Sequence, residues 1–90
     1  MPSTFDWDAR NTDYVSRHGI QTFEVEGAMA DPDRIGIDVH DRGKKGIIGR
    51  AEDGRPLFVV YVVHDGVYRV ITARGLTPTE KRIFQRRRRR

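Results

Sequence analysis

A hairpin in the last third of the chain most constrains the fold. Leu57–Val63 is a short apolar run rich in β-branched valine, and it predicts a central strand, being too short to cross a membrane. Asp65-Gly66 follows it. An Asp-Gly pair between two such runs indicates a two-residue turn in which both residues take positive φ. The second run, Val67–Ala73, is therefore predicted to be the antiparallel partner strand.

Two helices are predicted ahead of this hairpin. Asp8 or Asn11 is a suitable N-cap for a helix that stops at Gly19. Thr22 is predicted to cap a second helix, which ends at Asp31-Pro32 because proline disfavours a helical residue before it. A short first strand is predicted over residues 4–7.

The remaining pattern predicts two more strands and a final helix. Apolar residues alternate with polar ones from Ile35 to Val39, the period of a half-buried strand, and residues 46–51 form the next strand. Thr77-Pro78-Thr79-Glu80 combines a cap, a proline at the first helical position and a capping-box glutamate. We expect an α+β domain with two N-terminal helices, a four-stranded antiparallel meander and a C-terminal helix.

The charge is distributed unevenly along the chain. Ninety residues predict a single domain over residues 1–85, followed by a basic tail, Arg86–Arg90. Residues 1–41 hold three basic against nine acidic side chains, whereas residues 42–90 hold fourteen against four. One side of the molecule should therefore be cationic. Without the five terminal arginines the net charge of +4 becomes −1, so an anion-binding site must be a local patch.

Several classes of site are excluded by composition. The chain has no cysteine, which excludes a disulfide framework and thiolate metal ligands, and its three histidines lack the spacing of a zinc motif. No glycine-rich phosphate loop and no signal-peptide pattern are present. We expect a cytoplasmic protein that needs no metal or other cofactor and does not act at a membrane.

Several short motifs, taken in order, resemble a known family, the BrnT-type toxins of bacterial toxin–antitoxin pairs, within the broader RelE/ParE fold. The motifs are Phe5-x-Trp7-Asp8, Arg17-His18-Gly19-Ile20, Ile48-Gly49-Arg50, and Val70-Ile71-Thr72-Ala73-Arg74 followed by Glu80. The resemblance implies a RelE/ParE-like fold and a small metal-independent endoribonuclease that arrests translation. It also implies a cognate antitoxin as partner and an RNA substrate, either free or bound to the ribosome.

Two positions depart from the family pattern. The spacing from Trp7 to His18 is one residue shorter than usual, and Phe84 stands where the last helix often carries a tyrosine. No phenolic hydroxyl is therefore available at that position. Two alternatives stay open: a catalytically degenerate module that binds RNA or its antitoxin, and a gyrase-directed toxin like those of the ParE branch.

Arg69, Arg74 and His64 are the predicted catalytic residues. Metal-free RNA cleavage needs a base, an acid and cations that stabilise the charge of the transition state. The resemblance assigns the family's strand arginines to Arg69 and Arg74, which suit the last role. His64 is the histidine nearest the hairpin, and imidazole exchanges protons readily at neutral pH. Each has a structural alternative: an outward ion pair for Arg69, a pair with Glu80 for Arg74, and a turn position for His64.

A second set of residues is predicted to bind the RNA itself. It comprises three cations in a glycine-flanked loop, the arginine of the Ile-Gly-Arg motif, an aromatic residue suited to base stacking and an arginine of the last helix: Arg42, Lys44, Lys45, Arg50, Tyr61 and Arg82. The alternatives are a solvated loop, arginine stems that cover the sheet, and a tyrosine buried in the core.

Overall fold

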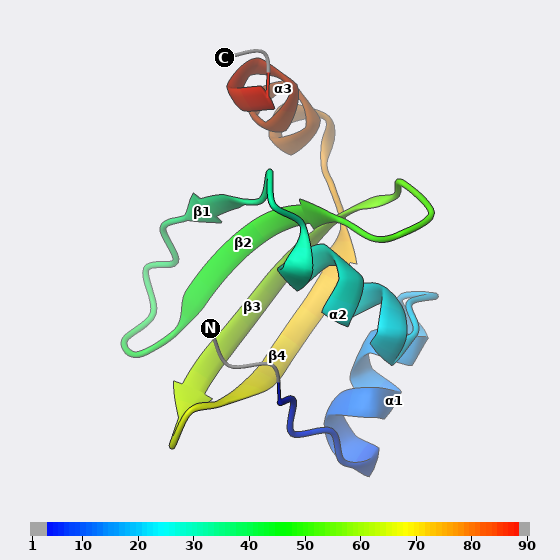
Figure 1. Ribbon diagram of the computed structural model, residues 1–90, viewed down its shortest axis with the longest axis vertical. Coiled ribbons are helices and arrows are strands. Elements are labelled where there is room, and N and C mark those ends of the chain that lie inside the picture. The colour runs from blue at the N-terminus through cyan, green and yellow to red at the C-terminus, as the bar shows by residue number, and fades with distance from the viewer. Residues whose placement is uncertain (1–3, 89–90) are drawn as a thin grey trace.

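Two helices lie against one face of an antiparallel sheet, and a third helix lies beyond the end at which the last strand finishes (Figure 1). The computed structural model describes residues 4–88. The elements are α1 (Ala9–Arg17), α2 (Thr22–Ala30), β1 (Ile35–Ile37), β2 (Lys45–Arg50), β3 (Pro56–His64), β4 (Val67–Gly75) and α3 (Pro78–Arg88). The strand order β1-β2-β3-β4 is the predicted meander. The predicted fold class is confirmed.

The β3–β4 hairpin has the predicted geometry. Asp65 and Gly66 have φ of 52° and 76°, and Asp65 is the one non-glycine residue with positive φ in the described part of the chain. The turn places His64 opposite Val67, which starts the antiparallel register. An irregularity between Val60 and Tyr61 then shifts this register along the strands.

Local capping determines where the first two helices begin. Asp8 is the N-cap of α1: its carboxylate accepts the Asn11 N–H at 3.0 Å, and the Asn11 side chain accepts the Asp8 N–H at 2.8 Å. The predicted cap of α2 was wrong by one residue, because Gln21 is the N-cap and Thr22 is the first helical residue. The Glu24 carboxylate accepts the Gln21 N–H at 2.9 Å, which satisfies the backbone at Gln21 and begins the helix there.

The N-terminal segment runs along the outer edge of β4. Phe5 and Tyr68 form an isolated parallel bridge, the Tyr68 N–H donates to the Thr4 carbonyl at 3.0 Å, and the Asp6 N–H donates to the Tyr68 carbonyl at 2.8 Å. This single bridge takes the place of the short first strand. Strand β1 is also shorter than predicted, because it ends at Ile37 and leaves Val39 in the following loop.

The main core lies between the sheet and the first two helices. Its buried residues include Val15 from α1, Val25 and Met29 from α2, and Leu57 and Val59 from β3. The opposite face of the sheet buries Ile48, and α3 contributes Phe84, which is 1% exposed. No helix in residues 4–88 has both the length and the apolar character needed to span a bilayer.

Helix α2 approaches β2 most closely at Gly49. A Cβ atom at this position would overlap the carbonyl oxygen of Ala28, a backbone group that cannot rotate away. Gly49→Ala should therefore push α2 off the sheet and lower the free energy of unfolding by about 2–4 kcal/mol. Urea denaturation of the purified protein measures this loss.

Gly36→Ala is the matched control, because Gly36 is also a strand glycine but a Cβ there would meet no atom within 4 Å. This variant should keep nearly wild-type stability. Equal stability of the Gly49→Ala and Gly36→Ala variants would contradict the described seating of α2 on β2.

Candidate functional site

The predicted site residues fall into two groups at opposite ends of the sheet. Arg50 ends β2 and Arg74 lies near the end of β4, two strands that run in the same direction, so both arginines lie at the α3 end. His64 and Arg69 lie at the other end, near the hairpin turn. Arg69 and Arg74 are five residues apart on β4, about 16 Å at the usual strand rise.

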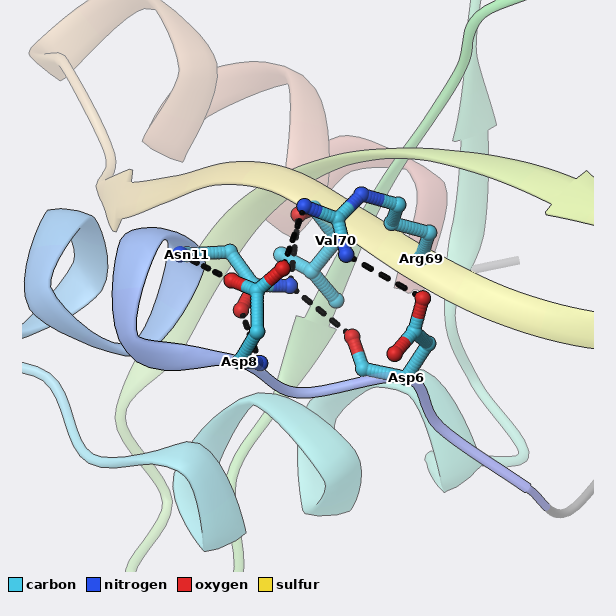
Figure 2. A network of polar contacts seen from close by, with 5 residues as sticks. All are labelled: Asp6, Asp8, Asn11, Arg69 and Val70. Carbon is cyan, nitrogen blue, oxygen red and sulfur yellow. Dashed lines mark hydrogen bonds and ion pairs between the residues drawn. The ribbon is translucent and has the colours of Figure 1, made fainter.

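Arg69 joins β4 to the segment that precedes α1 (Figure 2). Its Nη1 lies 3.1 Å from Asp6 Oδ2, and its Nη2 lies 2.9 Å from Asp8 Oδ2. The pKa of Asp8 is lowered by its hydrogen bond from the Asn11 backbone and then by Arg69, while the pKa of Arg69 is raised, first by Asp8. The outward ion pair weighed for Arg69 is present, and the guanidinium has a defined orientation.

Asn11 completes this network from the buried side. Its Nδ2 donates to the Asp6 carbonyl at 2.9 Å and to the Val70 carbonyl at 3.3 Å (Figure 2). The amide is 4% exposed, so these bonds satisfy a polar group inside the protein. Sequence reasoning considered Asn11 only as a helix cap and did not single out Asp6. The sequence signal that could have indicated this network is the pair of carboxylates, Asp6 and Asp8, on either side of Trp7.

An open hollow of about 660 Å³ lies beside the hairpin turn and brings His64 and Arg69 together. Asp6, Val62 and Val67 also line it. The His64 side chain is 87% exposed, with Nε2 3.4 Å from a carboxylate oxygen of the neighbouring Asp65. Two of the three predicted catalytic residues therefore share one solvent-accessible site.

The third predicted catalytic residue, Arg74, holds α3 to the sheet. Its Nη1 and Nη2 lie 2.7 and 2.9 Å from the two carboxylate oxygens of Glu80, and its guanidinium lies 4.7 Å from the Phe58 ring centroid. The hydrogen bond from Arg74 is the main reason that the pKa of Glu80 falls to about 2. Arg74 thus forms the ion pair weighed as its structural alternative, and a catalytic role for it stays a prediction.

Arg50 and Phe84 form a second attachment of α3. The Arg50 guanidinium lies 5.3 Å from the Phe84 ring centroid, and its Nη1 donates to the Gly54 carbonyl at 2.8 Å. The Phe84 ring is buried. The position at which the family often carries a tyrosine is therefore a packing position in this chain.

The remaining predicted RNA-binding residues have different environments. Lys44 pairs with Asp41 at 2.7 Å. Arg42, in the loop before β2, and Lys45, the first residue of β2, are exposed, and Lys45 lies at the same end of the sheet as His64. Tyr61 is half-buried, with an edge-on ring contact to Tyr68, and burial raises its pKa. It packs against the core more than it faces solvent.

Helix α3 carries a group of exposed cations. Arg82 is exposed and donates to the Thr79 hydroxyl at 3.1 Å. Lys81, Arg86 and Arg87 are also exposed, and none of these four cations has a carboxylate partner within residues 4–88. The helix extends to Arg88, so the first arginines of the predicted tail continue α3, whereas Arg89 and Arg90 lie outside the described residues.

Metal ligands do not cluster in the part of the chain that the structure describes. No group of three or more histidine, aspartate or glutamate side chains between residues 4 and 88 is placed to hold a metal ion.

These features define a small α+β protein in which carboxylates orient one arginine, Arg69 or Arg74, near each end of an antiparallel sheet. The chain belongs to the family described as the BrnT ribonuclease toxin of type II toxin–antitoxin systems, whose model matches residues 7–80. It is thus a toxin of a type II system with ribonuclease activity, which implies an RNA substrate and an antitoxin partner. The sequence matches no curated protein.

The Arg74–Glu80 pair should make stability depend on pH. Its pairing lowers the pKa of Glu80 from 4.5 to about 2, so the stabilisation is complete above pH 4.5 and is lost as the pH falls towards 2. Glu80→Gln keeps a side-chain acceptor for the Thr77 N–H but removes the charge. This variant should lose about 1–2 kcal/mol at pH 7, allowing for solvent screening.

Urea unfolding at pH 7 and at pH 3 measures this difference, which should shrink at the lower pH. Asp13→Asn is the control, because Asp13 forms an exposed ion pair with Arg17 on α1. Its stability should stay within a few tenths of a kcal/mol of wild type. A Glu80→Gln loss that is the same at both pH values would contradict the assigned cause.

Proposed function

We propose that this protein is a metal-independent endoribonuclease with a RelE/ParE-like fold that inhibits translation in the cytoplasm and is neutralised by its cognate antitoxin. Membership of the BrnT family supports the toxin and ribonuclease assignments. The observation that supports the location of the chemistry is the shared hollow of His64 and Arg69. An imidazole and an oriented guanidinium are the two groups that this reaction needs most.

The proposed reaction joins the RNA 2′-oxygen to the adjacent phosphorus. The His64 imidazole accepts the 2′-hydroxyl proton as the new O–P bond forms, and the bond from phosphorus to the 5′-oxygen breaks. The imidazolium then returns the proton to this leaving oxygen. The products are a 2′,3′-cyclic phosphate and a 5′-hydroxyl.

Arg69 stabilises the negative charge that develops on the phosphate oxygens. Its two ion pairs engage one N–H on each terminal nitrogen, and a guanidinium has five N–H donors. The remaining donors are available to a phosphate. Asp6 and Asp8 hold the group in place before RNA binds, so little reorganisation is needed when it does.

RNA affinity must come largely from other cations. Arg69 with Asp6 and Asp8 carries a net charge of −1. We propose that Arg42, Lys44 and Lys45, which lie at the same end of the sheet as the hollow, bind phosphates outside it. Arg50 and Arg82, at the α3 end, would bind phosphates further along the strand. Tyr61 is the proposed stacking residue.

Removal of either group in the hollow should abolish most of the cleavage. His64→Ala and Arg69→Ala should each lower the single-turnover rate about 10²-fold or more, because each removes a separate part of the chemistry. The measurement is cleavage of an RNA oligonucleotide in the presence of EDTA, with the 2′,3′-cyclic phosphate ends identified in the products.

Two controls match these variants. His40 is an exposed histidine 4.0 Å from Asp38, and Arg17 is an exposed arginine paired with Asp13. His40→Ala and Arg17→Ala should cleave at the wild-type rate. Full activity of folded His64→Ala would remove this hollow as the reaction site. A loss confined to Arg74→Ala, with Glu80→Gln fully active, would move the site to the α3 end.

The cations of α3 should set affinity rather than rate. Arg82→Glu/Arg86→Glu should weaken RNA binding and reduce its salt dependence by about two counterions, with little change in the saturated cleavage rate. Arg10→Glu/Arg17→Glu on α1 is the matched control and should bind almost normally. Equal weakening by both pairs would mean that net charge alone, and not α3, determines the affinity.

A catalytically degenerate binder is the second candidate. The net negative charge of the Arg69 cluster and the buried Phe84 favour it. Under this reading the wild-type protein binds the oligonucleotide and leaves it intact under every condition of the cleavage assay.

A further inference from the structure

The hollow beside the hairpin turn holds one more hydrogen-bond acceptor than Arg69 uses. Both carboxylate oxygens of Asp8 are engaged, one by the Asn11 N–H and one by Arg69. Asp6 Oδ2 also accepts from Arg69, but Asp6 Oδ1 accepts no hydrogen bond from any residue between 4 and 88 (Figure 2). Side-chain exposure of Asp6 is 55%, so this oxygen is accessible to a ligand.

An extra carboxylate does not suit a site for phosphate alone. A negative charge 3.1 Å from Arg69 weakens the attraction of a second anion to this arginine. The Asp6 carboxylate instead suits a ligand that has N–H donors of its own. The accessible oxygen of Asp6 therefore indicates that a group with N–H donors binds here in addition to the phosphate.

The walls of the hollow favour a flat and partly apolar ligand. Phe5, Val62 and Val67 line it together with the polar groups, and its volume of about 660 Å³ is large enough for a nucleobase and its ribose. Bases unstacked from RNA bind proteins in this way, with one face on apolar side chains and one edge hydrogen-bonded.

We propose that this hollow is a guanine-binding subsite of the ribonuclease, a proposal that rests on the proposed function. Guanine carries adjacent N1–H and N2–H donors, which match the carboxylate of Asp6. Next to them is its O6 acceptor, which matches one free N–H of Arg69 and leaves the other two free N–H groups to the phosphate. The Asp6–Arg69 contact places the acceptor and the donor side by side, in the order that this base edge requires.

The other three bases fit this pair less well. Adenine and cytosine each present a ring-nitrogen acceptor where the Asp6 carboxylate needs a donor. Uracil presents a single N–H between two carbonyl oxygens. Asp6 thus repels the wrong bases as well as attracting guanine. Because His64 lines the same hollow, cleavage takes place in the backbone beside the bound guanine.

Cleavage of matched oligonucleotides tests the subsite. Four RNAs that differ only in one central nucleotide, and a fifth with inosine, are cut by the wild-type protein. We expect cleavage beside guanine to be about tenfold faster than beside adenine, cytosine or uracil. Inosine should be cut more slowly than guanine, because it lacks the 2-amino group. Asp6→Asn should lose most of the preference, and Asp38→Asn, an exposed aspartate in the loop after β1, should keep it.

The outcomes separate the subsite from the ribonuclease proposal. Equal cleavage of all five RNAs, or an unchanged preference in Asp6→Asn, overturns the subsite and leaves the endoribonuclease standing. Absence of cleavage overturns the proposed function, and binding of 2′-deoxy versions then decides the subsite by fluorescence anisotropy. The subsite is supported if the wild-type protein binds the guanine oligonucleotide more tightly than the others and if Asp6→Asn removes this difference. Equal affinity for all five oligonucleotides would refute the subsite.

Discussion

Strand β4 is the element to which both the segment before α1 and helix α3 are attached. The backbone of Tyr68 pairs with the N-terminal segment, and Arg69 and the Val70 carbonyl hold the start of α1. At the other end of the strand, Arg74 holds α3 through Glu80. The pairing of β4 with β3, set by the Asp65-Gly66 turn, therefore positions groups that are more than sixty residues apart in the chain.

This arrangement couples stability to function. The arginines that the family resemblance assigns to the site also form ion pairs that attach neighbouring elements, Arg69 to the N-terminal segment and Arg74 to α3. Such pairs orient a guanidinium before a ligand arrives, and they also compete with that ligand for its charge. In our proposals Arg69 remains accessible enough to bind RNA, whereas Arg74 serves mainly to position α3.

The two ends of the sheet also differ in charge. At the hairpin end, carboxylates accompany the cations, and Asp6 retains an accessible oxygen. On α3 the one acidic residue, Glu80, is paired with Arg74, so the exposed cations of the helix have no carboxylate partner on the helix itself. Our proposals therefore place base-selective RNA contacts at the hairpin end of the sheet and non-selective phosphate contacts at the α3 end.

Sequence alone determined the features that depend on neighbouring residues. The Asp65-Gly66 turn, the helix start at Asp8 or Asn11 and the Thr77–Glu80 capping box are local, because their hydrogen bonds join residues within a few positions of each other. Charge patterning likewise indicated a cationic side. The predicted site residues could be named one by one, but their grouping at two ends of the sheet could not.

Only the tertiary structure decided which groups meet. The contacts of Arg69 with Asp6 and Asp8 span more than sixty positions, and the burial of Phe84 depends on how α3 docks. Such contacts leave no periodic pattern in the chain, because they arise from strand register and from the direction in which each side chain leaves the sheet. The register of β4 therefore placed His64 and Arg69 in one hollow and left Arg74 at the far end.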